Sequence, residues 1–192
     1  MGPVSLSLGA GEAALLHGPN GSGKTTLMLG IIGAAESSGR VRVSGRDVTA
    51  LPTHERGIAY SPAHPVLPGW MRVGDLVRMV GPSAAGILEE FGLGWTLGRR
   101  AGSLSTGERK VVQVAMALAS DAEVLLLDEP LSNLSEEWAS RMLGAILRER
   151  RPVVVSHQEV PRGFSVRVRL VPSAGGAGVE LERARRVDRR RN

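Results

Sequence analysis

The first third of the chain mixes two spacings of hydrophobic residues. Residues 4–8 alternate apolar and small polar side chains, which is typical of a half-buried strand. Residues 24–35 instead repeat apolar side chains at helical spacing, so they predict a helix. Short apolar runs predict further strands at residues 13–17, 40–43 and 57–60, with a turn at 44–47.

The rest of the chain alternates buried strands with helices. Glycine-rich residues 70–100 predict a small helical insertion, with helices around 73–80 and 87–91. Later elements are expected as a helix at 110–120, a strand at 123–127, a helix at 135–151, a strand at 153–156 and a hairpin of 166–171 with 179–182. This order predicts an α/β fold with a parallel-sheet core and a small antiparallel β edge. One domain is expected over residues 1–182, with a compact helical subdomain at about 70–105.

Composition narrows the possible chemistry. A chain of 192 residues has room for one domain, and the absence of cysteine excludes disulfides, thiolate metal sites and cysteine nucleophiles. The net charge of +5 lies in a basic C-terminal tail, because residues 183–192 hold six Arg and one Asp and residues 1–182 are formally neutral. No fold-wide basic face for nucleic acid follows. The tail is expected to be solvated or to contact anionic lipid.

A phosphate-binding loop is the strongest motif. Gly18-Pro-Asn-Gly-Ser-Gly-Lys24-Thr25 matches G-x-x-x-x-G-K-[ST] and lies between a predicted strand and a predicted helix, as the motif requires. Its glycines let backbone N–H groups turn toward a phosphate, Lys24 supplies charge for the β- and γ-phosphates, and Thr25 can ligate Mg²⁺. The sequence thus predicts a P-loop NTPase core that binds a nucleoside triphosphate together with Mg²⁺. The expected nucleotide-binding residues are Gly18, Pro19, Asn20, Gly21, Ser22, Gly23, Lys24, Thr25 and Thr26.

Two carboxylates and a histidine follow predicted strands farther along the chain. Asp128 and Glu129 come at the carboxyl end of a buried strand, where open α/β sheets bind ligands. Asp128 is expected to hold Mg²⁺ with Thr25, and Glu129 to orient or deprotonate the water that attacks the γ-phosphate. His157 follows the next strand and is a candidate donor to the γ-phosphate and that water, although a structural role in its loop fits equally well. The expected catalytic residues are Lys24, Glu129 and His157.

Residues Leu104-Ser-Thr-Gly-Glu108 resemble the signature motif of ATP-binding cassette (ABC) ATPases. The order of phosphate loop, signature, acidic pair and histidine is also that family's order, and Ser105 with Glu108 fits a helix capping box. The resemblance implies that two copies pair head to tail. The γ-phosphate held by one copy would then be bound by the signature residues of the other: Ser105, Thr106, Gly107 and Glu108. Residues 132–135 correspond to the segment that couples the two sites.

The same resemblance implies partners and a location. Such ATPases power transport by separate integral membrane subunits and act as homodimers or heterodimers. No apolar stretch approaches the roughly 20 residues that cross a bilayer, so the chain is expected to be cytoplasmic, peripheral to the inner face of the cell membrane. Trp70 in the helical insertion fits either an interface with that partner or the core. The short chain and Ser156-His157-Gln158 further resemble the ATPase of the haem exporter used in cytochrome c maturation.

The chain departs from the family pattern at two functional positions. The family's glutamine that touches Mg²⁺ or the attacking water falls on Ala63, with His64 as a candidate substitute. No aromatic residue precedes Tyr60, so the family's adenine-stacking residue has no counterpart. Hydrolysis is still expected, because the residues assigned to chemistry are all present. A soluble ABC-type ATPase acting on nucleic acid or in assembly, and a catalytically degenerate regulatory cassette, remain alternatives.

Overall fold

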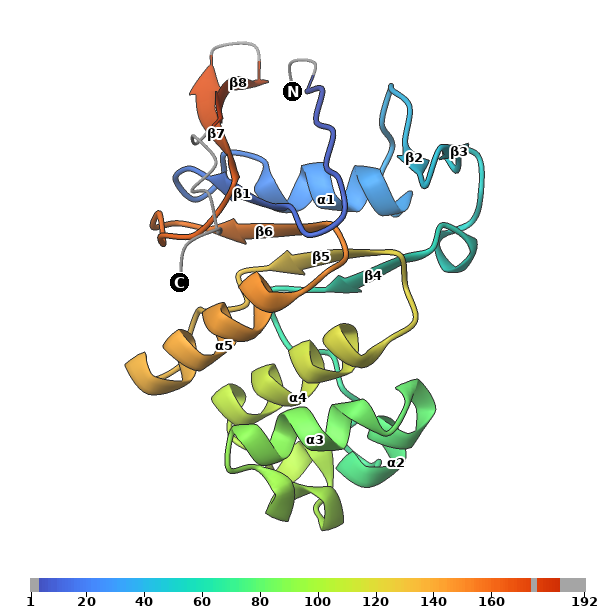
Figure 1. The fold of residues 1–192 in the computed structure, drawn as a ribbon, viewed down its shortest axis with the longest axis vertical. Coiled ribbons are helices and arrows are strands. Elements are labelled where there is room, and N and C mark those ends of the chain that lie inside the picture. Colours follow the sequence, from blue (N-terminus) through green and yellow to red (C-terminus); the bar gives the residue numbers. More distant parts are fainter. Residues whose placement is uncertain (1–3, 174–175, 184–192) are drawn as a thin grey trace, which may run out of the picture.

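The computed structural model describes residues 4–173 and 176–183, which form a mixed sheet with helices on both faces (Figure 1). Within these residues the main sheet has six strands. Their order across the sheet is β4 (Ile58–Ser61), β5 (Val124–Asp128), β6 (Val153–His157), β1 (Ala13–His17), β7 (Val166–Ser173) and β8 (Gly176–Arg183). Neighbouring strands are parallel except β7 and β8, which pair antiparallel. The predicted α/β class, with a parallel core and an antiparallel edge, is confirmed.

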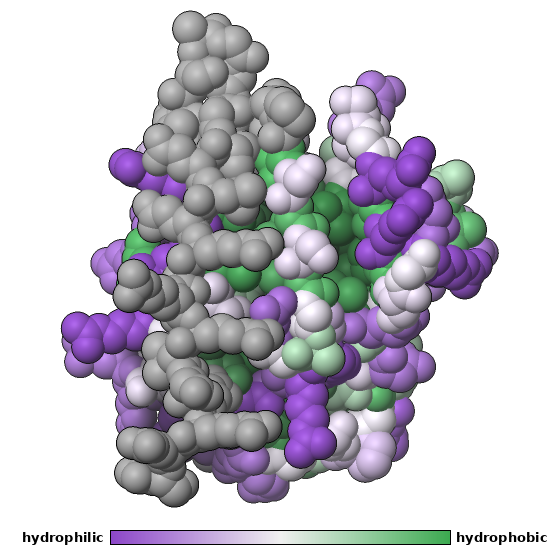
Figure 2. Space-filling view, turned by 45° about the horizontal axis from the view of Figure 1, so that its top comes forward, coloured by the Kyte–Doolittle hydropathy of each residue, from purple (hydrophilic) through white to green (hydrophobic). Residues whose placement is uncertain are grey.

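Two hydrophobic cores lie on opposite faces of this sheet. On one face α1 (Lys24–Ile32) packs, and on the other α4 (Thr106–Ala119) and α5 (Glu136–Arg148) pack (Figure 1). Because side chains alternate along a strand, Leu15 of β1 joins the α4–α5 core while Leu16 joins the α1 core. Figure 2 views the molecule from the α1 side, where apolar surface lies among hydrophilic side chains. Both faces of the parallel strands are therefore covered, as their continuous apolar sequences predict.

A helical layer lies beyond α4, away from the sheet (Figure 1). It contains α2 (Val73–Val80), α3 (Ser83–Glu90) and the short 3₁₀ turns Gly94–Gly98 and Ala101–Ser103. The helix expected at 73–80 is confirmed. The second helix starts at Ser83 rather than at 87, because its first turn is made of small residues whose spacing carries little hydrophobic signal.

The N-terminal segment corrects one prediction. Residues 4–8 form no strand, although their exposure alternates as expected and Leu6 and Leu8 pack against the α1 core. Alternation fixes which side chains face a core, but a strand also needs a hydrogen-bonded neighbour.

Other element boundaries shift by a few residues. The α1 helix ends at Ile32 rather than at 35, because Gly33 adopts a left-handed φ of 75° and its N–H caps the helix. The strand expected at 40–43 shortens to β2 (Arg42–Val43), which pairs with β3 (Arg46–Asp47) through the expected turn. Thr53–Glu55 adds a 3₁₀ turn before β4.

Candidate functional site

The phosphate-binding loop joins β1 directly to α1. Gly23 is the N-cap of α1 with a left-handed φ of 93°, and no side chain caps the helix. The first backbone N–H groups of α1 therefore have no intrahelical acceptor, and they point with the positive end of the helix dipole toward the loop. Gly21, with φ of 78°, has nothing within 4 Å of a Cβ built on it, so this side of the loop is open. The loop offers an anion site of the kind the motif predicts.

The start of the loop is packed tightly against a neighbouring strand. A Cβ built on Gly18 would overlap the carbonyl oxygen of Leu170 in β7 and lie 3.0 Å from Ser22 Oγ. Ser22 itself is buried, and its hydroxyl finds no hydrogen-bond partner in the described part of the chain. The loop is thus held by backbone contact at one end and carries an unsatisfied buried hydroxyl at the other.

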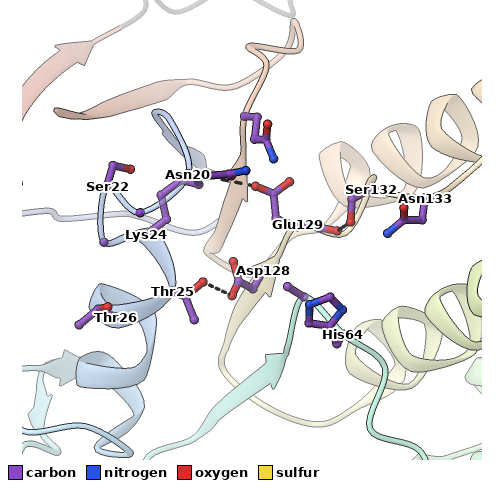
Figure 3. A pocket seen from close by; sticks show the side chains of 14 residues that line it. Asn20, Ser22, Lys24, Thr25, Thr26, His64, Asp128, Glu129, Ser132 and Asn133 are labelled. Atoms are coloured by element: carbon purple, nitrogen blue, oxygen red, sulfur yellow. Dashed lines mark hydrogen bonds and ion pairs between the residues drawn. The ribbon is translucent and has the colours of Figure 1, made fainter. Parts of the chain in front are cut away.

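Lys24 lies across the loop and faces the end of β5. Its Nζ donates to the carbonyl oxygens of Gly18 at 2.8 Å and Pro19 at 3.2 Å. The same nitrogen lies 4.0 Å from Glu129 Oε1, and Figure 3 shows this pair spanning the pocket. Both side chains are largely buried, so water screens their attraction less than it would at the surface.

Asp128 is a buried carboxylate held by three hydroxyl groups. Thr25 Oγ1 donates to its Oδ2 at 2.7 Å and Tyr60 OH at 3.2 Å, while Ser156 Oγ donates to Oδ1. Burial raises the pKa of the Tyr60 hydroxyl and the adjacent carboxylate raises it further, so Tyr60 remains a donor. The motifs predicted the meeting of Asp128 with Thr25. Tyr60 and Ser156 were missed because hydroxyl residues inside strands carry no pattern of their own.

Glu129 leaves β5 in a conformation that favours glycine, with a φ of 48°. Its backbone N–H donates to Ser156 Oγ at 2.9 Å, and Ser132 Oγ donates to its carbonyl oxygen at 2.8 Å. Its Oε2 lies 2.8 Å from His157 Nδ1. Strands β5, β6 and β1 are parallel neighbours, so their carboxyl ends bring Glu129, His157 and the phosphate loop to one edge. His157 contacts the carboxylate and does not line the pocket formed by the described residues.

The pocket between the loop and this edge contains most of the predicted site. It is lined by Asn20, Gly21, Ser22, Gly23, Lys24, Thr25, Thr26, Ala63, His64, Asp128, Glu129, Ser132, Asn133 and Gln158. Ala63 and its neighbour His64 both reach it, and Figure 3 shows His64 on the wall opposite the loop. No Phe, Tyr or Trp of the described residues lines it.

The signature residues Ser105, Thr106, Gly107 and Glu108 lie elsewhere in the chain. Ser105 Oγ accepts from the Glu108 N–H at 3.2 Å and the Ser105 N–H donates to Glu108 Oε2 at 2.7 Å, so the predicted capping box is confirmed. Ser105 and Thr106 are exposed at the start of α4, and none of the four residues lines the pocket of the same chain. A Cβ on Gly107 would lie 3.3 Å from the carbonyl oxygen of Asn133, which adopts a left-handed φ of 60°.

The residues at the pocket fit a magnesium-bound polyphosphate. Thr25 and Asp128 offer a hydroxyl and a carboxylate oxygen 2.7 Å apart, which are hard oxygen donors of the kind that Mg²⁺ prefers. The open face of Gly21, the unsatisfied Ser22 hydroxyl, the Lys24 ammonium and the free N–H groups of α1 all suit phosphate oxygens. Thr25, Asp128 and the loop would hold such a ligand.

A family model described as ABC transporter matches residues 1–132. The chain belongs to the ABC transporter family. It is 34% identical over 184 residues to the molybdate/tungstate import ATP-binding protein WtpC of Thermococcus kodakarensis, covering 90% of this chain and 56% of that protein. It is 38% identical over 147 residues to a sulfate/thiosulfate import ATP-binding protein of Shewanella oneidensis, covering 68% of this chain and 42% of that protein. The ABC chain thus spans about half the length of these relatives.

Solved structures share the same fold. A putative ABC transporter ATP-binding protein from Pyrococcus furiosus superposes with a TM-score of 0.73 at 26% identity, covering 83% of this chain and 84% of that one. The resemblance to haem exporter ATPases finds no support, because the two sequence relatives named above are import ATP-binding proteins. No helix in residues 4–173 or 176–183 is long and apolar enough to cross a membrane. Most of the basic tail, residues 184–192, lies outside the described residues.

Proposed function

We propose that this chain is the ATP-binding and ATP-hydrolysing subunit of an ABC importer, working at the cytoplasmic face of the membrane with separate membrane subunits. The observation that carries the proposal is the setting of Glu129. Its carboxylate lies between His157 Nδ1 at 2.8 Å and Lys24 Nζ at 4.0 Å, at the mouth of a phosphate loop. A carboxylate in this position is suited to receive a proton from a water that attacks a phosphate held by the loop.

The chain's own groups divide the work of hydrolysis. The loop and Lys24 bind the phosphates, and Thr25 with Asp128 would hold the Mg²⁺ ion, which supplies Lewis-acid charge stabilisation when bound. As the water oxygen bonds to the γ-phosphorus, its proton passes to Glu129 and the bond to the bridging oxygen of ADP breaks. His157 holds the carboxylate in orientation through its Nδ1.

The signature residues are proposed to complete the site of a second copy. Ser105 and Thr106 are exposed at a helix start, away from their own chain's pocket, and a helix N-terminus offers free N–H donors to phosphate. Residues 132–135 reach the pocket through Ser132 and Asn133, and Asn133 also borders Gly107. This contact supports their predicted role in coupling the two sites of a head-to-tail dimer.

Phosphate release from the purified chain tests the proposed activity. With MgATP we expect steady turnover that stops when EDTA removes Mg²⁺ and returns when Mg²⁺ is restored, because Thr25 and Asp128 would hold the ion through one hydroxyl and one carboxylate oxygen. Turnover is expected to rise with the square of protein concentration at low concentration if two copies form each site. Absence of turnover, both alone and with the co-purifying membrane protein, would contradict the proposal.

An apolar surface on the helical layer is proposed to contact the membrane subunit. Of the five large hydrophobic side chains exposed in the described residues, four lie on or beside this layer, and Val160 lies elsewhere. The four are Val66, Trp70, Met79 and Trp95. Trp70 is 75% exposed, which excludes the core alternative for this residue. Exposed arginines Arg72 and Arg100 pair their backbones beside it, so an apolar partner segment that carries acidic residues fits this surface.

Replacing Trp70 by serine should separate docking from hydrolysis. Aromatic residues at interfaces contribute heavily to affinity, so we expect co-purification of the membrane protein to fall about tenfold or more. The basal ATPase rate should stay unchanged. The matched control is Val160→Ser, an exposed hydrophobic residue away from the layer, which should alter neither quantity. Equal losses in both variants would contradict the assignment of this surface.

The direction and cargo of transport are proposed from the relatives. The two named above import molybdate or tungstate and sulfate or thiosulfate, which are small oxyanions. We infer the same class of cargo for the transporter served by this chain. Identification of the co-purifying membrane protein, followed by uptake of labelled sulfate and molybdate into vesicles, tests this inference. ATP-dependent efflux instead of uptake would contradict it.

A further inference from the structure

Lys110 is the largest side chain that the described residues bury completely. It lies in the first half of α4, with an exposed fraction of 0%. Its Nζ donates to the carbonyl oxygen of Ala63 and, at 3.2 Å, to that of Glu129. Both acceptors belong to residues that line the nucleotide pocket, on two different walls. One ammonium therefore ties the pocket wall at residues 61–66, of which Ala63 and His64 line the cavity, to the catalytic end of β5.

Burying an ammonium in a core is costly unless its protons meet acceptors. Burial lowers the pKa of Lys110, whereas the carboxylates of Asp128 and Glu129 act in the opposite direction by favouring its charge. An apolar residue would fill the same space in α4 without this cost. Instead, two carbonyl oxygens accept hydrogen bonds from the Lys110 ammonium, and the carboxylates of Asp128 and Glu129 lie near enough to favour its positive charge.

The carbonyl that Lys110 binds belongs to a residue that needs support. Glu129 adopts a left-handed φ of 48°, which a side-chain-bearing residue holds only where its surroundings impose it. Its carbonyl oxygen accepts from Lys110 Nζ, from the Ser132 N–H at 3.2 Å and from Ser132 Oγ at 2.8 Å. Of these donors, Lys110 is the one that belongs to α4.

A second residue of α4 forms hydrogen bonds with the same pocket wall. Gln113, one helical turn after Lys110, donates through Nε2 to Ser61 Oγ at 3.1 Å and to the Pro62 carbonyl at 3.0 Å. Its Oε1 accepts from the Val66 N–H at 2.8 Å. These hydrogen bonds of Gln113 reach residues 61, 62 and 66, and among the described residues none joins it to Glu129. The two side chains thus share the wall at 61–66, while the link to the catalytic carboxylate belongs to Lys110.

We propose that Lys110 is a positioning residue for Glu129, which fixes the catalytic carboxylate to α4 and to the pocket wall at 61–66. The inference rests on the proposed ATPase function. The same helix, α4, begins at the exposed signature residues, where a phosphate is proposed to bind. Five residues after its N-cap, its buried Lys110 contacts the carbonyl oxygen of Glu129. The helix therefore connects the proposed phosphate contact to the catalytic centre of the same chain.

The test compares Lys110→Met with Gln113→Met. Methionine keeps the apolar stem of Lys110 and removes the ammonium, so we expect kcat to fall about 10- to 100-fold with the KM for ATP within about twofold. Lys110→Gln retains N–H donors and should recover much of kcat. In a Glu129→Gln background, Lys110→Met should cause no further loss, because it acts through that carboxylate. Gln113→Met is expected to lower kcat less than Lys110→Met does.

Hydrogen exchange supplies a readout independent of turnover. In Lys110→Met, amides of residues 61–66 and of 128–133 should exchange faster, whereas Gln113→Met should affect 61–66 alone. Wild-type kcat in Lys110→Met, parallel losses of kcat and ATP affinity, or unchanged exchange at 128–133 would each overturn the proposal. If Lys110→Met does not fold, Lys110→Gln with the same exchange and kinetic measurements decides. Absence of turnover in the wild-type chain would instead contradict the ATPase function itself.

Discussion

Replacing Glu129 by glutamine is expected to slow ATP hydrolysis at least about 100-fold, because the amide cannot take the proton that the attacking water loses. Glutamine keeps the length of the side chain and can still meet His157, which lies 2.8 Å from the carboxylate. The phosphate loop is untouched, and removal of the negative charge 4.0 Å from Lys24 favours a bound polyanion. ATP affinity should therefore stay the same or increase. Phosphate release and equilibrium binding of a labelled ATP analogue measure the two effects separately.

The matched control for this variant is Glu123→Gln. Glu123 is an exposed carboxylate just before β5, at the opposite end of the same strand, and its contact is with Ser44 Oγ. This change should leave the hydrolysis rate within about twofold, since surface polar contacts contribute little. Wild-type turnover in Glu129→Gln would show that Glu129 is not the general base. Equal losses in both variants would point to a general effect of lost charge.

Replacing Gly18 by alanine is expected to lower the free energy of unfolding by about 3 kcal/mol. The new methyl group would overlap the carbonyl oxygen of Leu170, which is backbone in β7 and cannot rotate away as a side chain would. To relieve the overlap, the start of the phosphate loop has to move away from β7. Since Gly18 also offers its carbonyl oxygen to Lys24 Nζ, ATP binding should weaken together with stability. Urea unfolding and nucleotide titration check both expectations.

Gly11→Ala is the control for backbone strain. Gly11 also has a positive φ, 72°, but nothing lies within 4 Å of a Cβ built on it. The substitution should cost about 1 kcal/mol, the penalty of a left-handed backbone alone. ATP affinity should be unchanged. If Gly18→Ala proved no more destabilising than Gly11→Ala, the close approach to β7 would not be a constraint on the loop.

The features that sequence could predict are those whose physical cause is local. The capping box of Ser105 and Glu108 needs four consecutive residues, and the phosphate loop needs eight, so both can be recognised before the fold is known. The pairing of Thr25 with Asp128 was also predicted. It follows from a general rule, since the carboxyl ends of the parallel strands of one sheet lie at the same edge, and here β6 alone separates β5 from β1.

The contacts that sequence could not predict depend on register and packing between distant segments. Tyr60 reaches Asp128 because β4 and β5 pair with Tyr60 opposite Leu126, and nothing near Tyr60 in the chain reports that register. In the sequence, nothing distinguishes Lys110 from a lysine on the exposed face of a helix. Its burial follows from the packing of α4 against the rest of the fold. Residues 4–8 show the opposite failure, because their alternation was correct but they pair with no strand in the part of the chain that the structure describes.

The burial of Lys24 and Lys110 has a consequence for the chemical reactivity of the folded chain. These are the two lysines in the sequence, and every other basic side chain apart from histidine is an arginine. Both ammonium groups lie beside the nucleotide pocket with exposed fractions of 7% and 0%. Acylating agents that attack primary amines, and enzymes that acetylate lysine, therefore meet no lysine on the outer surface. The rate of lysine acylation in this protein would therefore depend on how often the pocket opens and exposes Lys24 or Lys110.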